Sequence, residues 1–300
     1  MHDEFTPLLG STDWNEEWKE LQKLRRHADD ASFWDKRSAT FTTKDAPNRY
    51  VEQFLAYAAI RPGETVFDMG CGTGALAVPL GEAGHKVAAA DFSQGMLDQM
   101  QVRLDAAGVR TVFPKLMSWE DDWPAFGVRA GMTDVAIASR SIATADLRDS
   151  LLRLSEVARR RVCITLATAS SPRVDERILA AAGLPCLIGR DYLYAFNILA
   201  AEGIKAEVRY IASTREDTFA TPEDAFEKLA AMIDDSSAVQ ASAAERERAR
   251  ANLREWLAVN LVPNEHAGEP DCKGVAQGAW HLAEPRTVTW AFLAWNTDGT

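Results

Sequence analysis

An apolar segment ends in a glycine-rich turn in the sequence Val-Phe-Asp-Met-Gly-Cys-Gly-Thr-Gly, which spans Val66 to Gly74. Glycine lacks a Cβ atom, so it adopts turn conformations that other residues avoid and lets a ligand approach the backbone closely. Asp91 ends a second apolar segment, 21 residues after Gly70. A carboxylate at the end of such a strand can accept hydrogen bonds from both hydroxyls of a ribose. The two features together predict a binding site for a nucleoside-containing ligand.

The spacing of the glycines separates two kinds of ligand. Dinucleotide-binding turns favour G-x-G-x-x-G, whose third glycine brings a helix close to a pyrophosphate. Here the spacing is G-x-G-x-G, and Asp68 precedes it. A carboxylate at Asp68 would repel a pyrophosphate. S-adenosylmethionine has no phosphate, and its sulfonium and ammonium groups outweigh its carboxylate, so the acidic turn favours this ligand.

The segment from Val66 to Leu80, together with Asp91-Phe92-Ser93 and Met96-Leu97, resembles motif I and the following acidic motif of the class I S-adenosylmethionine-dependent methyltransferases. The resemblance extends over about residues 65–213 and the last predicted strand, and its specific motifs lie within residues 66–97. It implies S-adenosyl-L-methionine as cofactor and S-adenosyl-L-homocysteine as product, and it is nearest to a bacterial subset of small methyltransferases whose acceptors are mostly unassigned. A small-molecule acceptor is expected, because the sequence has no basic groove for nucleic acid, no membrane segment and a large apolar cap, and a protein acceptor stays open.

The resemblance also implies a set of cofactor-binding residues. Ser118 stands after the third predicted strand, where family members usually carry an aspartate near the adenine, and Trp119 either stacks on the adenine or packs at the strand end. Trp34 and Arg37, with Phe41 and Tyr50, resemble residues that the family places over the methionine end. The residues expected to bind the cofactor are Trp34, Arg37, Asp68, Gly70, Cys71, Gly72, Gly74, Asp91, Phe92, Met96, Ser118, Trp119 and Ser139.

Methyl transfer depends mainly on positioning and desolvation, and it needs a general base only if the acceptor must lose a proton early. Arg140, after the fourth predicted strand, either orients an anionic acceptor or forms a salt bridge near its loop. Candidate bases are His266, His281, Tyr192 and Tyr194, although surface or packing roles explain each of them as well. The catalytic candidates are therefore Arg140, Tyr194 and His281, and no metal site is predicted.

Strands and helices alternate from residue 65, which is typical of right-handed βαβ units. The pattern predicts an α/β fold with a parallel sheet, and the resemblance to class I methyltransferases implies a Rossmann-like, seven-stranded, mostly parallel sheet of order 3-2-1-4-5-7-6 with an antiparallel last strand. The expected strands are 65–69, 86–91, 111–116, 134–139, 162–167, 206–213 and 287–295, and the expected helices between them are 75–83, 94–107, 145–158, 174–182 and 191–202.

We expect one methyltransferase domain over residues 1–300. Residues 1–62 form an N-terminal helical cap, with one helix after Asp13 and another over 46–60. The Rossmann-like core comprises 63–213 and 287–300. Residues 214–286 form a helical insertion, with helices over 222–233 and 243–259, and the insertion and the cap are expected to cover the site where the acceptor enters.

The amino-acid composition limits the kinds of partner that this protein is expected to bind. The net charge of -11 and the pI near 5.0 disfavour binding to nucleic acid, which needs clustered basic residues. The short run Arg159-Arg160-Arg161 is expected at a solvated helix end. Cys71, Cys163 and Cys186 are expected to be reduced, buried thiols, and Cys272 also lacks a C-x-x-C partner.

No apolar run is long enough to span a bilayer and no basic leader opens the sequence, so a cytoplasmic protein without a membrane partner is expected. The sequence does not indicate an oligomeric state. Two other functions stay open. A non-catalytic S-adenosylmethionine-binding module would keep every cofactor motif, whereas an NAD-dependent oxidoreductase fits the glycine spacing and Asp68 less well.

Overall fold

The structure, a computed structural model, describes residues 7–25, 31–38, 49–168, 175–185, 190–234, 241–271 and 274–297. Its main sheet has the strand order β3-β2-β1-β4-β5-β10-β6. These strands are β1 (Val66–Met69), β2 (Val87–Asp91), β3 (Val112–Leu116), β4 (Thr133–Ser139), β5 (Ala158–Ala167), β6 (Glu207–Arg215) and β10 (Arg286–Asn296). Strand β10 runs antiparallel to β5 and β6, and the other pairs are parallel. The predicted sheet and its antiparallel last strand are confirmed.

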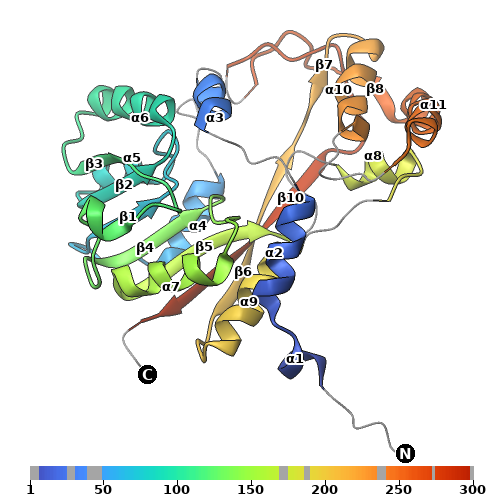
Figure 1. Ribbon diagram of the computed structural model, residues 1–300. Coiled ribbons are helices and arrows are strands. Elements are labelled where there is room, and N and C mark those ends of the chain that lie inside the picture. The colour runs from blue at the N-terminus through green and yellow to red at the C-terminus, as the bar shows by residue number, and fades with distance from the viewer. Residues whose placement is uncertain are drawn as a thin grey trace, which may run out of the picture.

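Helices cover both faces of this sheet (Figure 1). One face packs against α4 (Arg49–Ala58), α5 (Ala77–Glu82) and α6 (Gln94–Ala107). The other packs against α2 (Trp14–Leu24), α7 (Leu147–Val157) and α9 (Asp191–Ala201). Strands buried on both faces must be apolar nearly throughout, which explains why all four residues of β1 are buried. The alternation of elements in the sequence thus produces a three-layer α/β/α arrangement.

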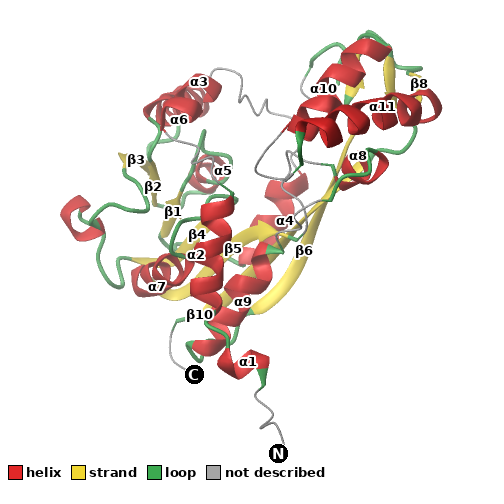
Figure 2. Cartoon of the chain, turned by 45° about the vertical axis from the view of Figure 1, so that its right-hand side comes forward, coloured by secondary structure: helices red, strands yellow, loops and turns green. Residues whose placement is uncertain are grey.

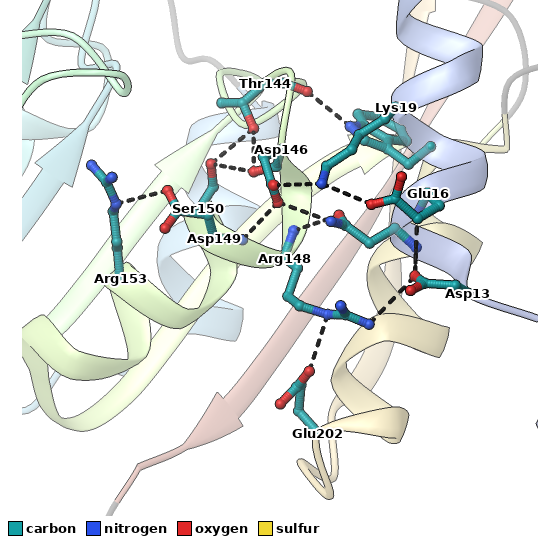
Figure 3. A network of polar contacts seen from close by, with 12 residues as sticks. Asp13, Glu16, Lys19, Thr144, Asp146, Arg148, Asp149, Ser150, Arg153 and Glu202 are labelled. Carbon is teal, nitrogen blue, oxygen red and sulfur yellow. Dashed lines mark hydrogen bonds and ion pairs between the residues drawn. The ribbon is translucent and has the colours of Figure 1, made fainter.

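The N-terminal helix α2, which follows the short helix α1 (Leu8–Ser11), is tied to the start of α7 by a polar network (Figure 3). Its predicted cap is confirmed, because the Asp13 carboxylate accepts the N–H groups of the first turn. Asn15 and Lys19 of α2 both contact Asp146, the residue that caps α7. The buried Trp18 indole donates to the carbonyl of Thr144 at 2.8 Å. Helix α2 therefore fixes the far end of the loop that leaves β4.

The insertion between β6 and β10 contains α10 (Pro222–Asp234) and α11 (Ala243–Asn260), which confirms both predicted helices. It also contains a second sheet of order β7-β9-β8, whose strands are β7 (Thr218–Phe219), β8 (Leu261–Pro263) and β9 (Trp280–Leu282). The sequence pattern did not predict this sheet, because its strands have only two or three residues each. Together with α8 (Glu176–Ala181), these elements enclose a third hydrophobic cluster.

Strands β6 and β10 carry the insertion away from the main sheet (Figures 1 and 2). Because β6 is parallel to β1–β5, its carboxyl end lies at the same edge of the sheet as theirs. The first four residues of β10 pair with β6 but extend past the end of β5. The division of the chain into cap, core and insertion stays a prediction. None of the helices in the described ranges is long and apolar enough to cross a membrane.

The three consecutive arginines correct one expectation. They lie within β5, which begins directly after α7 ends, and not at a solvated helix end. Arg159 pairs with Asp134 at 2.8 Å and Arg160 with Glu64 at 2.5 Å, while Arg161 pairs with Glu207. Pairing with β4 and β10 extends β5 towards its N-terminal end, and carboxylates distant in sequence neutralise the three guanidinium charges. Local helix propensity therefore does not decide the secondary structure of this segment.

Two of the cysteines can be compared with their expectation. Cys71 and Cys163 are buried, free thiols, and burial raises the pKa of both. Cys186 and Cys272 lie outside the described residues.

Candidate active site

The turn after β1 needs its glycines for two different reasons. Gly70, Gly72 and Gly74 all have positive φ, at 73°, 55° and 78°. A Cβ on Gly70 would lie 2.3 Å from the Cβ of Ser141, and one on Gly74 would lie 2.7 Å from a side-chain carbon of Met100. A Cβ on Gly72 would meet no heavy atom of the described residues within 4 Å. The outer two glycines therefore allow close packing, whereas the backbone at Gly72 is open to a ligand.

Asp68 is a buried carboxyl group at the end of β1, with 1% of its surface exposed. Burial, with a further contribution from the charge of Asp91, raises its pKa to about 8. No hydrogen bond to this carboxylate comes from any of the described residues. Burying an ionised carboxylate without a partner is unfavourable. A cationic group placed beside Asp68 would restore its charge, so the residue fits a ligand with an ammonium group.

Asp91 joins the two loops that follow β1 and β2. One carboxylate oxygen accepts the N–H of Gly72 at 2.8 Å, and the other accepts the N–H of Ser93 at 2.9 Å. Burial raises the pKa of Asp91 although these bonds oppose the shift. A carboxylate has about four acceptor positions, so Asp91 can accept from further donors beyond these backbone amides. Asp91 thus has a structural role in addition to the predicted contact with a ribose.

Helix α3 (Ala31–Ser38) lies against the beginning of α6, a contact that the sequence did not indicate. The carboxylate of Asp35 accepts the hydroxyl of Ser93 at 2.6 Å and the N–H of Gly95 at 3.0 Å. These bonds lower the pKa of Asp35. A Cβ on Gly95 would lie 2.7 Å from the hydroxyl of Ser38. The absence of a side chain at Gly95 therefore allows α3 to dock.

The remaining predicted residues of this region stay predictions for cofactor binding. Trp34 lies on α3 with its ring 5.5 Å from that of Phe33, and it is half-buried. Phe92 is half-buried and Met96 is buried at the start of α6. The side chain of Arg37, like Phe41 as a whole, lies outside the described residues.

Hydrogen bonds within the loop after β3 fix its conformation. The N–H of Ser118 donates to Asp121 at 2.7 Å, and the indole of Trp123, in a short 3₁₀ helix (Trp123–Phe126), donates to the carbonyl of Ser118 at 3.2 Å. Trp119 packs on Trp123 with the ring centroids 5.5 Å apart. Trp119 thus packs at the strand end, and both its stacking on adenine and a contact of Ser118 with adenine stay predictions.

A hydroxyl network connects α4 with the ends of β4 and β5. The phenol of Tyr50 lies 2.7 Å from the hydroxyls of both Ser139 and Thr165. Burial raises the pKa of Tyr50. Thr165 also accepts the backbone N–H of Arg140 at 3.0 Å. The network fixes the point at which the chain leaves β4, next to the glycine turn, where Ser141 donates to the carbonyl of Met69 at 2.7 Å.

Arg140 itself is exposed and has an unusual backbone, with a φ of 60°. Its guanidinium carbon lies 4.4 Å from the ring centroid of Tyr50 and 5.9 Å from that of Trp290. Among the described residues, no carboxylate forms an ion pair with it. The salt-bridge alternative for Arg140 is therefore not formed within this part of the chain. Sequence reasoning missed Thr165 and Trp290, which carry no local motif.

The other two catalytic candidates are not brought to these loops. Tyr194 lies between α9 and α2, where its hydroxyl donates to Glu17 at 2.7 Å, and burial with this bond raises its pKa to about 12. His281 lies in β9 of the insertion, with Nδ1 2.9 Å from the carbonyl oxygen of Leu282. Helix packing and the small sheet account for both residues, and a catalytic role for either stays a prediction.

The weaker base candidates also lie elsewhere. Tyr192 packs against Tyr210 of β6 with the ring centroids 6.0 Å apart. His266 is exposed and pairs with Glu269 at 2.9 Å in the insertion.

Comparison with known proteins agrees with this geometry. Residues 66–160 match the model of a family described as a methyltransferase domain. These residues include the glycine turn, Asp91 and the loop of Arg140. This part of the chain is therefore similar to a methyltransferase domain.

An uncharacterized protein of Haemophilus influenzae is 33% identical over 180 residues, which cover 59% of this chain and 65% of that protein. The structure of the YcgJ protein from Bacillus subtilis has 12% identity and a TM-score of 0.49, and the match covers 84% of this chain and 99% of that one. Magnesium protoporphyrin IX methyltransferase from Synechocystis, solved with bound S-adenosylhomocysteine, has 19% identity and a TM-score of 0.46 and covers 65% of this chain and 94% of that one.

Proposed function

We propose that this protein is an enzyme that transfers a methyl group from S-adenosylmethionine to a small-molecule acceptor. The observation that supports the proposal most strongly is the carboxyl group of Asp68, which is buried without a hydrogen-bond donor from the described residues at the end of β1. A dinucleotide would bring a pyrophosphate, and therefore a like charge, towards this group. The ammonium group of S-adenosylmethionine would supply the missing opposite charge.

Three features of the glycine turn and its neighbours fit the cofactor. Asp68 would hold the ammonium group, and the free acceptor positions of Asp91 would hold the ribose hydroxyls. The open side of Gly72 leaves the backbone accessible between these two carboxylates. When bound, S-adenosylmethionine would supply an electrophilic methyl group. A lone pair of the acceptor would form the new bond to the methyl carbon, and the electrons of the broken carbon–sulfur bond would stay on sulfur. Any acceptor proton would leave to solvent.

The chain's own residues then act mainly by positioning. The phenol of Tyr50 shares hydrogen bonds with the hydroxyls of Ser139 and Thr165, and the raised pKa of Tyr50 keeps this phenol protonated at neutral pH. The proposal therefore assigns no general base among them. Rigid side chains around the reacting atoms lower the entropic part of the barrier, which is the largest contribution that a methyl transfer needs.

A small-molecule acceptor is the finer part of the proposal. The net charge of -11 supports it against nucleic acid, since polyphosphate backbones bind to clustered lysine and arginine. A cytoplasmic location stays a prediction.

Calorimetric titration of the protein with S-adenosylmethionine and with NADH tests the cofactor. We expect micromolar binding of the former and none of the latter; tight binding of NADH with no binding of S-adenosylmethionine would refute the proposal. Release of S-adenosylhomocysteine is then measured over a panel of small acceptors. Binding without turnover on any acceptor would favour the non-catalytic binding module over the enzyme.

A further inference from the structure

The Arg140 side chain, beside the glycine turn, is a cation that has no carboxylate partner among the described residues. Arginines elsewhere in the described chain are mostly paired: Arg153 with Asp149, Arg177 with Asp175, and Arg254 with Glu223. Arg140 instead lies above the rings of Tyr50 and Trp290. Aromatic rings attract the face of a guanidinium group, and this leaves its in-plane N–H donors available for an anion.

The position of Arg140 places these donors next to the methyl-transfer site of the proposed function. The next residue, Ser141, contacts the first glycine of the turn closely, because a Cβ on Gly70 would lie 2.3 Å from the Cβ of Ser141. Ser141 also donates to the carbonyl of Met69 at 2.7 Å. The loop of Arg140 and the glycine turn therefore form one packed unit at the edge of the sheet.

The side chain is also held in place before any ligand arrives. A positive φ is unfavourable for a residue with a side chain and persists only when the surroundings impose it. Here the backbone N–H of Arg140 donates to Thr165, and the phenol of Tyr50 is fixed by Thr165 and Ser139. Trp290 lies on β10 and packs edge-on against Tyr50 at 6.5 Å. Residues from four separate elements thus keep the guanidinium group in one region.

From this geometry we infer that Arg140 binds a carboxylate group of the methyl acceptor. The planar fork of a guanidinium group matches the two oxygens of a carboxylate. A single cation balances one negative charge, and Asp68 and Asp91 already make this end of the sheet acidic. A phosphate would bring up to two charges, so a monoanionic carboxylate fits better. The carboxylate anchors the acceptor, and another atom of the acceptor receives the methyl group. The inference rests on the proposed function for the reaction but not for the binding of the anion.

The direct test uses the smallest carboxylate and its uncharged analogue. The Nε–H signal of Arg140, assigned by its loss in Arg140→Lys, is followed by nuclear magnetic resonance while acetate or acetamide is added to the protein saturated with S-adenosylhomocysteine. We expect a saturable shift with acetate and none with acetamide. The Arg254 signal serves as a control in the same spectrum, because its guanidinium group also lies on an aromatic ring but is bound by Glu223. No shift of Arg140 with acetate, or an equal shift with acetamide, would overturn the inference.

A second test compares acids and their amides as acceptors, such as glycine with glycinamide and salicylate with salicylamide. For any pair that is methylated, we expect the acid to be the substrate. Arg140→Met should then lower kcat/KM about 10- to 100-fold, as expected for the loss of a charged hydrogen bond, and Arg254→Met should leave it unchanged. Amides methylated as well as their acids would contradict the inference.

S-adenosylmethionine affinity separates the two proposals. It should agree within about twofold between wild type and Arg140→Met, which also shows that the variant is folded. Absence of S-adenosylmethionine binding to the wild-type protein would refute the proposed function, and the acetate titration of the ligand-free protein would then decide the inference on its own.

Discussion

The two sides of the candidate site differ in charge, burial and origin. The side proposed for the methyl donor consists of buried carboxyl groups, Asp68 and Asp91, set among backbone amides within one strand-turn-helix unit and the next strand. The side proposed for the acceptor consists of an exposed cation, Arg140, supported by aromatic rings and hydroxyls from α4, β5 and β10. Neighbours in the sequence build the first side, whereas the tertiary structure builds the second.

This difference indicates which side of the candidate site can change its ligand. A carboxyl group buried at the end of a central strand is fixed by the sheet, so its ligand is fixed as well. An exposed side chain at a loop can be replaced at a small cost in stability. We therefore expect donor binding to respond strongly to single substitutions, and acceptor choice to change without loss of the fold.

The largest effect is expected for Asp68→Asn. The amide is close in size but lacks the charge that would balance the ammonium group, and loss of one partner of a buried ion pair costs about 3 kcal/mol or more. Affinity for S-adenosylmethionine, measured by calorimetry, should fall more than a hundredfold. Unchanged affinity in the folded variant would remove the main support for the cofactor.

The same substitution has an effect on stability with a definite sign. The pKa of Asp68 is raised from 3.8 to about 8 in the folded protein. Between these values the folded state holds a proton that the unfolded state has released, so the free energy of unfolding falls as the pH rises. This group lowers the stability of the ligand-free protein by at most about 1.4 kcal/mol per pH unit. Denaturant unfolding at pH 5 and pH 8 should show a smaller difference for Asp68→Asn than for wild type.

Asp91→Ala should weaken S-adenosylmethionine binding by about 1.5–3 kcal/mol through loss of hydrogen bonds to a charged acceptor. The same variant leaves the N–H groups of Gly72 and Ser93 without their acceptor. Asp91→Asn retains one acceptor oxygen and is the matched control for the loop contacts. If calorimetry finds wild-type affinity for the folded alanine variant, the assignment of Asp91 to the ribose is wrong.

The substitution Gly95→Ala tests the docking of α3 on α6, because the sign of its effect on the free energy of unfolding depends on that contact. Alanine favours a helix by about 1 kcal/mol over glycine, so the variant should be more stable if α3 plays no part. Because the new Cβ would lie 2.7 Å from the hydroxyl of Ser38, we expect a loss of about 1 kcal/mol instead. Thermal unfolding of Gly95→Ala and of Asp35→Ala measures this loss of stability. A raised Tm for Gly95→Ala would show that the contact between α3 and α6 is unimportant.

The smallest effect is expected for Tyr194→Phe. The variant loses one hydrogen bond to the exposed Glu17, worth at most about 1 kcal/mol. Turnover and affinity for S-adenosylmethionine should not change. A large drop in turnover at normal stability would return Tyr194 to the list of catalytic residues.

The sequence predicts the donor side well because its determinants are adjacent along the chain. The glycine turn, Asp91 and the capping Ser93 all lie within one βαβ unit. The alternating strands and helices predict a parallel sheet, and the family resemblance implies its strand order. The acceptor side depends on contacts between distant residues, such as Tyr50 with Thr165, 115 positions apart. No local pattern records such contacts. The arginines of β5 were assigned wrongly for the same reason, since Glu207 lies far along the chain from Arg161.

The pairing of β6 with β10 gives the insertion a simple relation to the rest of the chain. Arg215 at the end of β6 lies directly opposite Arg286 at the start of β10. Everything between them is therefore the loop of one antiparallel hairpin, and a turn of two residues is enough to close such a hairpin. These two positions define a junction for chimeric proteins. At this junction, residues 216–285 could be exchanged for a turn or for another module without altering the register of the seven-stranded sheet, once the apolar face of α8 is made polar.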